Sequence, residues 1–184
     1  LRNDLKLLPL AKGTKVYFET FYNNGRSQNP VSVFKTEKSN WNIQFVPTKD
    51  EADVILLWLI PNGGGLFSSA GTPIDLGLSK NRIDVAHVNE LRTSKPTIVV
   101  INYTNPWVID EIDTGNLKTV LATFGTTQEA LLDVVTGKFN PSGKMPFTTP
   151  SSMKAVLENK ADVPGYLEPA GYALFKFNEG LSYK

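Results

Sequence analysis

The chain has 184 residues, enough for one domain with a sizeable core, and its 41% apolar and 20% charged residues are ordinary for a globular fold. Nineteen basic and eighteen acidic residues leave a formal charge of +1, so there is no positive surplus for binding nucleic acid or an anionic membrane. The absence of cysteine excludes disulfides and thiol catalysis, and a single histidine excludes a multi-histidine metal site. We therefore expect no cofactor, no metal, no nucleic acid and no membrane among the ligands and partners.

The chain begins at Leu1 without a basic and apolar leader, which suggests a fragment whose native start lies elsewhere. The longest apolar run, residues 52–61, is shorter than the roughly 20 residues that cross a bilayer. The compartment stays open, and a secreted or a periplasmic location agrees with the composition.

Five short apolar runs rich in β-branched residues predict buried strands, at 15–21, 42–46, 52–60, 97–103 and 120–124. The runs at 54–60 and 98–101 are nearly continuous rather than alternating, which is typical of strands covered on both faces in a parallel sheet.

Three segments between or after these runs predict helices. The segment 83–91 brings Ile83, His87, Val88 and Leu91 to one face, and 106–112 begins with a proline suited to a first turn. The clearest helix is 128–136, where Thr126 and Glu129 have the spacing of a capping box and Gly137 provides a stop.

This alternation of strand and helix predicts a layered α/β sandwich with a mainly parallel sheet, in which ligands bind near the carboxyl ends of the strands. The alternating segment 172–177 predicts an added antiparallel edge strand. There is no internal repeat or low-complexity linker, so residues 1–184 are expected to form a single domain.

The best candidate for a ligand-binding loop follows the predicted strand 52–60. Consecutive glycines let the backbone approach a ligand closely, and amide, hydroxyl and aromatic groups surround them. The predicted substrate-binding residues are Asn62, Gly63, Gly64, Phe67, Ser68 and Ser69. The alternative is a flexible connection with a solvated glycine run.

Other segments carry weaker signals. The segment 102–107 offers polar and aromatic groups at a strand's carboxyl end, although Trp107 is expected in the core. His87 is expected to be a satisfied packing residue, because apolar residues share its helical face. The acidic clusters at 50–53 and 110–113 are expected to be solvated, so no residue of the chain is assigned a catalytic role.

Two motifs near the end of the chain resemble the closing segment of family 3 glycoside hydrolases. The first is Phe139-Asn140-Pro141-Ser142-Gly143-Lys144-Met145-Pro146, and the second is Phe177-Asn178-Glu179-Gly180-Leu181-Ser182-Tyr183. The opening 3–10 and the lysine-proline-strand segment 95–102 are similar to segments of the same family, in the same order. The resemblance covers residues 6–183 and matches the α/β-sandwich domain that follows a (β/α)8 barrel in complete members.

The resemblance implies a part of a retaining β-glycosidase, a β-glucosidase or β-N-acetylhexosaminidase, whose partners are an upstream barrel domain and a carbohydrate. Family members that take their acid from this domain have a glycine-glutamate-glycine loop, whereas the matching loop here, 62–69, has no glutamate. The nucleophile of the family is a barrel aspartate after a serine, and this sequence has no Ser-Asp dipeptide. We therefore expect the isolated chain to be inactive and the motifs to build scaffold.

Two other functions remain open from the residues alone. One is a noncatalytic carbohydrate-binding or interaction module that works without a barrel. The other is a flavodoxin-like or Rossmann nucleotide binder, which the alternation of strand and helix allows but which lacks a phosphate-binding fingerprint here.

Overall fold

The computed structural model describes residues 1–22, 41–62, 75–112, 115, 117–160, 162, 165–166 and 169–183. Its main sheet has six strands in the order β1-β6-β5-β4-β2-β3, and all neighbours are parallel except β1 and β6. The strands are β1 (Arg2–Asn3), β2 (Lys15–Tyr22), β3 (Gln44–Phe45), β4 (Val54–Ile60), β5 (Thr97–Asn102) and β6 (Thr119–Thr123). The predicted mainly parallel α/β fold is confirmed.

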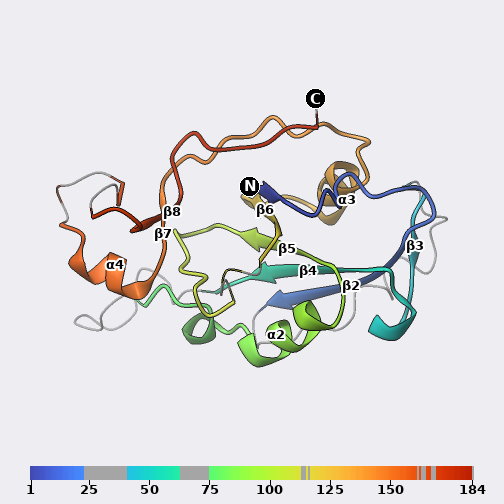
Figure 1. The fold of residues 1–184 in the computed structure, drawn as a ribbon, viewed down its shortest axis with the longest axis horizontal. Coiled ribbons are helices and arrows are strands. Elements are labelled where there is room, and N and C mark those ends of the chain that lie inside the picture. Colours follow the sequence, from blue (N-terminus) through green and yellow to red (C-terminus); the bar gives the residue numbers. More distant parts are fainter. Residues whose placement is uncertain are drawn as a thin grey trace.

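Helices cover both faces of this sheet (Figure 1). Helix α2 (Val85–Ser94) lies on one face, and α3 (Gln128–Val135) lies on the other. Short 3₁₀ helices η1 (Lys49–Glu51) and η2 (Ser79–Asn81) lie in the connections. Within the described ranges, none of the helices has the length and apolar character needed to cross a membrane.

The sheet divides the core into two layers. Alternate residues of β4 enter opposite layers: Ile55, Leu57 and Leu59 pack on the α2 side, and Val54, Leu56 and Trp58 pack on the α3 side. Each of these side chains is buried, which explains why the strand has no polar face. Each Å² of apolar surface removed from water contributes about 25 cal/mol to the free energy of folding. The buried strands are therefore the main source of stability.

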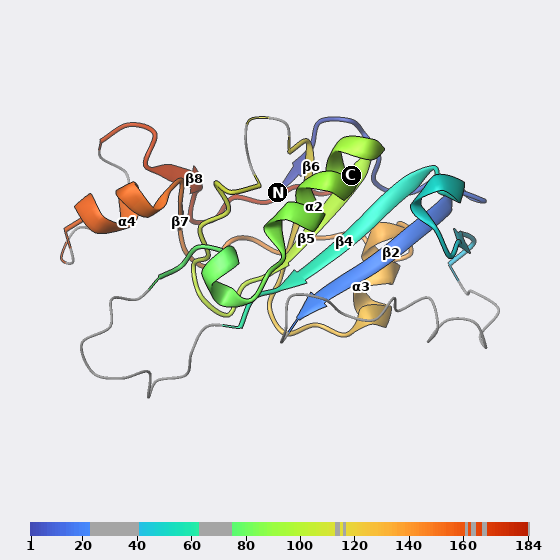
Figure 2. The same cartoon turned by 90° about the horizontal axis from the view of Figure 1, so that it is seen from below.

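A small second sheet lies beyond the carboxyl ends of the main strands (Figures 1 and 2). It pairs β7 (Thr149–Pro150) with β8 (Ala173–Phe175) in antiparallel fashion, and helix α4 (Met153–Glu158) lies between them in the sequence. The segment predicted at 172–177 does form an antiparallel strand, β8, but in this second sheet rather than at the edge of the main one. Strand β1 pairs with part of the outer edge of β6, and the β8 backbone is bonded instead to Thr149, whose Oγ1 accepts the Phe175 N–H at 3.0 Å.

The predicted helix at 106–112 does not form. Val108 pairs with Gly77 in an isolated parallel bridge, and its N–H donates to the Leu76 carbonyl at 2.9 Å. Trp107, Val108 and Ile109 are consecutive and all buried, so this segment lacks the single apolar face of a surface helix. Its bridge to residues 76–77 satisfies the backbone in place of helical bonds.

Helix α3 has nearly the predicted bounds, but a different residue caps it. The Thr127 hydroxyl accepts the Ala130 N–H at 3.3 Å, whereas Thr126 was expected in this role. The helix begins at Gln128, so the residue directly before it is the one placed to cap. Gly137 ends the helix with φ +75°, as expected, and a Cβ there would lie 2.7 Å from the Pro9 Cβ.

The two family-like motifs pack directly against one another. The Asn140 Oδ1 accepts bonds from the Ser182 hydroxyl at 3.0 Å and the Tyr183 N–H at 2.8 Å. The Lys144 Nζ donates to the Gly180 carbonyl at 2.7 Å, and the backbones of Met145 and Glu179 are bonded at 2.9 Å. These contacts join two extended segments, residues 139–146 and 177–183, which we call the strap. The strap runs across the α3 side of the domain (Figure 1). The strap is scaffold, as expected for these motifs.

Candidate functional site

The topology marks one place on the sheet as the natural ligand cleft. The connection from β2 leads outward to β3 on one side, whereas the connection from β4 leads to β5 on the other. Loops that leave neighbouring parallel strands in opposite directions open a crevice at the carboxyl ends of those strands. The strand order therefore predicts a ligand cleft between the ends of β2 at Tyr22 and β4 at Ile60.

The predicted ligand loop begins at this point. Asn62 is exposed directly after β4, as a ligand contact requires. The other predicted binding residues, Gly63, Gly64, Phe67, Ser68 and Ser69, lie outside the described residues. Their role stays a prediction.

The base of the loop is held by one residue that sequence reasoning missed. The carbonyl of buried Asn81 accepts the Asn62 N–H at 3.1 Å. The Asn81 Nδ2 donates to the carbonyls of Asp75 at 2.8 Å and Gly77 at 2.6 Å. Asn81 therefore joins the two ends of the loop, which fixes where it leaves and rejoins the domain. No local pattern indicates the bond between Asn62 and Asn81, because these two residues lie on opposite sides of the loop in the sequence.

Polar side chains join the carboxyl ends of β4, β5 and β6. The Asn102 Oδ1 accepts the Thr123 hydroxyl at 3.2 Å and the Gly125 N–H at 2.8 Å. The Thr123 hydroxyl in turn accepts the Trp58 Nε1–H at 3.2 Å. All three side chains are buried, so these bonds hold the three strand ends in register beside the cleft.

This network changes the interpretation of the segment 102–107. The Asn102 side chain is used within the protein, although the sequence suggested a ligand contact. Trp107 is 1% exposed, and its Nε1 donates to the Asn102 carbonyl at 3.1 Å, so the expected core position is confirmed.

Three aromatic rings gather next to this network. Tyr103 stacks on Phe124 with ring centroids 6.1 Å apart, and Phe147 meets both rings edge to face at 6.0 and 6.1 Å. Tyr103 is buried, whereas Phe124 keeps 48% of its surface exposed. Such contacts orient an aromatic ring, and its free face can pack on an apolar surface. An aromatic residue and a glycine directly after a buried strand were the signal that the sequence offered.

The single histidine has a partner that the sequence did not reveal. His87 Nε2 lies 3.1 and 3.3 Å from the two carboxylate oxygens of Glu19, which is 5% exposed in the middle of β2. The Tyr17 hydroxyl donates to the same carboxylate at 2.8 Å, and burial followed by this bond raises the Tyr17 pKa. His87 is therefore satisfied, as expected, and it also accompanies a buried carboxylate. A glutamate inside an apolar strand was the available signal.

The described members of the acidic clusters are engaged within the domain. Glu111 accepts the Ser79 N–H at 2.9 Å, and burial and then the charge of Glu111 raise the pKa of Asp110. Asp53 accepts the Lys15 N–H at 2.8 Å at the opposite end of β2 from the cleft. Within the described ranges, no group of three or more metal-ligating side chains occurs.

The described part of the site can position a ligand. It combines a fixed loop base, a rigid strand edge and an oriented ring at the carboxyl ends of the sheet. None of these groups, at its observed place, supplies the two carboxylates that cleave a glycosidic bond.

Comparison with known proteins identifies the family of this chain. The profile of the "Glycosyl hydrolase family 3 C-terminal domain" matches residues 1–183. "Probable beta-glucosidase C" of Aspergillus flavus is 35% identical over 192 residues, covering 100% of this chain and 27% of the relative. "Beta-glucosidase C" of Emericella nidulans is 35% identical over 193 residues, again covering all of this chain and 28% of the relative.

A solved structure supports the fold independently. The beta-glucosidase from Listeria innocua in complex with isofagomine superposes with a TM-score of 0.67 at 18% identity, over 100% of this chain and 32% of that one. The chain spans about a quarter of the length of the curated relatives named above. With a profile match over nearly its full length, the chain belongs to the glycosyl hydrolase family 3 C-terminal domain family.

Proposed function

We propose that this chain is the C-terminal domain of a retaining β-glucosidase and that it closes one side of the sugar cleft against an upstream (β/α)8 barrel. The observation that carries the proposal is the 35% identity, over the whole chain, to relatives named as β-glucosidases that are about four times longer. Residues 1–184 act as one domain, and the barrel supplies the reacting carboxylates.

The roles of the two domains follow from the residues that this domain contains. In retaining cleavage one carboxylate attacks the anomeric carbon, and a second group protonates the departing oxygen. The loop after β4 carries no glutamate, so the acid comes from outside this chain. The domain contributes the loop that starts at Asn62, which contacts the sugar, orders it and excludes water.

The test uses the full-length protein and an aryl β-glucoside. We expect hydrolysis with retention, seen by NMR as the β-anomer of glucose appearing first. The isolated 184-residue chain, as the matched control, is expected to show no turnover.

Two outcomes would contradict the proposal. Turnover by the isolated chain would show that the reacting groups lie within it. Sugar binding by the full-length protein without any turnover would favour a noncatalytic binding module instead.

A further inference from the structure

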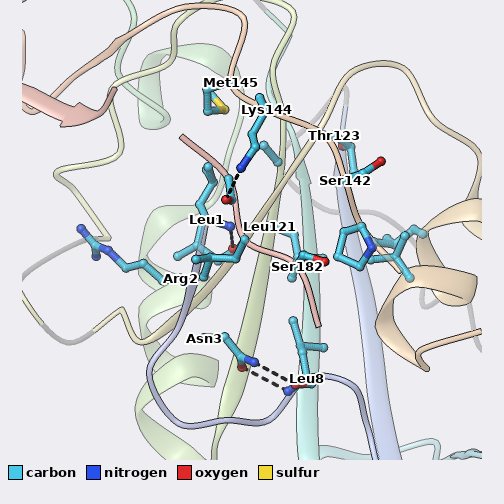
Figure 3. Close-up of a pocket in the computed structure, with 18 of the residues that line it drawn as sticks. Leu1, Arg2, Asn3, Leu8, Leu121, Thr123, Ser142, Lys144, Met145 and Ser182 are labelled. Atoms are coloured by element: carbon cyan, nitrogen blue, oxygen red, sulfur yellow. Dashed lines mark hydrogen bonds between the residues drawn. The ribbon is translucent and has the colours of Figure 1, made fainter. Parts of the chain in front are cut away.

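A hollow with a volume of about 420 Å³ lies between the outer edge of β6, helix α3 and the strap (Figure 3). Its walls are mostly apolar side chains from segments that are distant in sequence, including Leu8, Leu121, Leu131, Phe139 and Met145. Ala130 of α3 is exposed and lines the same hollow. None of these groups belongs to the cleft between β2 and β4.

The floor of the hollow is an incompletely paired sheet edge. The Thr123 carbonyl accepts the N–H of Tyr103, the residue directly after β5, at 2.8 Å. Because backbone groups of successive strand residues point to opposite edges, the N–H and carbonyl of Ala122 face away from β5 and toward the hollow. Strand β1 covers only the beginning of this edge, with Arg2 opposite Val120 and Asn3 opposite Thr119.

The position of Leu1 suits an uncharged backbone N–H. Its nitrogen donates to the Val120 carbonyl at 2.8 Å, and burial lowers the pKa of this amino group from 8.0 to about 6. A peptide N–H at the same place would make a hydrogen bond without a charge to desolvate. Figure 3 shows Leu1 inside the hollow, beneath the strap.

We propose that the hollow binds the polypeptide segment that immediately precedes Leu1 in the full-length enzyme. This segment continues β1 as an edge strand along β6. The inference rests on the proposed function, which places an upstream domain before this one. The relatives, about four times longer, provide such a segment.

The register fixes the path of this segment. Continued antiparallel pairing places the residue before Leu1 opposite Ala122 and the third residue before Leu1 opposite Phe124. At roughly 3.4 Å per residue, the segment travels about 10 Å toward the carboxyl ends of the strands. It therefore leaves the domain on the side of the cleft, where the barrel must lie to close it. The second residue before Leu1 shares the face of Leu1 and is expected to be apolar.

Hydrogen exchange on the full-length protein tests directly whether this segment pairs with β6. We expect the Ala122 amide to be protected to within about tenfold of the Leu121 and Thr123 amides, which face β5 in either case. Ala122 exchange more than about a hundredfold faster than Thr123 exchange would overturn the proposal. Protection that falls on dilution would also overturn it, because a second copy would then be the occupant.

A pair of variants sharpens the test. Ala130→Trp fills the hollow, whereas Glu129→Trp places the same ring on the neighbouring exposed position of α3, which does not line the hollow. The first is expected to raise Ala122 exchange about tenfold or more, and the second to leave it unchanged. Unchanged exchange in Ala130→Trp would contradict the proposal. Unaltered Leu121 and Thr123 amides verify the fold, and hydrolysis of the aryl glucoside by the same preparation tests the proposed function separately.

Discussion

The main sheet and the strap are held together by different forces. Strands β2, β4, β5 and β6 are buried between two apolar layers, and their stability comes from many small contacts. The strap is held by a small set of hydrogen bonds, such as those to Asn140, and by one close backbone crossing at Gly180. Damage to the sheet should therefore unfold the domain, whereas damage to the strap should release one segment first.

The largest expected effect comes from the sheet. Leu57→Ala removes a fully buried side chain from β4 and should lower the free energy of unfolding by about 3 to 4 kcal/mol. Leu157→Ala, at a leucine that is 75% exposed on α4, is the matched control and should change it little. Denaturant unfolding measures both, and equal losses in the two variants would contradict the comparison.

A smaller effect is expected where the two halves of the strap cross. A Cβ at Gly180 would lie 2.4 Å from the Gly143 carbonyl oxygen, so Gly180→Ala must push the two segments apart. We expect a loss of about 2 kcal/mol, with faster hydrogen exchange in the strap than in β4. Gly143→Ala meets no atom within 4 Å and should be nearly neutral. If Gly143→Ala costs as much as Gly180→Ala, crowding at the crossing is not the cause.

The smallest effect concerns the end of the strap and depends on pH. The Tyr183 hydroxyl donates to the Val134 carbonyl at 2.7 Å, and burial raises the pKa of Tyr183 from 10.0 to about 12. Because the folded value is the higher one, this contribution is complete below pH 10 and is lost as the pH rises toward 12. The alkaline loss of stability should therefore be smaller in Tyr183→Phe than in the unsubstituted protein, because the contribution of Tyr17 remains in the variant. Parallel pH profiles for the two proteins would show that Tyr183 does not contribute.

Elements with strong local patterns were predictable from the sequence. The strands were predictable because runs such as 54–60 are apolar throughout. Helix α3 was predictable because its apolar residues recur on one face and a glycine follows the helix. The helix expected at 106–112 failed because a bridge to Gly77, far from it in the chain, decided the conformation. Strand β1 has two residues, too few to produce a periodic pattern.

Only the location of the candidate site was predictable from the sequence. The end of β4 follows from the strand pattern and the parallel topology, and Asn62 lies there. The bond between Asn62 and Asn81 across the loop arises only when the chain is folded, as does the contact of Glu19 with His87, 68 residues away. Neither residue has a sequence neighbour that indicates its partner.

The mutual packing of the two terminal motifs affects how such domains are recognised in genomes. The NPSG and GLSY stretches would be retained by selection for closure of the strap, even in a paralogue whose enzyme had lost its reactive carboxylates. A sequence signature built on these two stretches therefore reports the architecture of the domain rather than its chemistry.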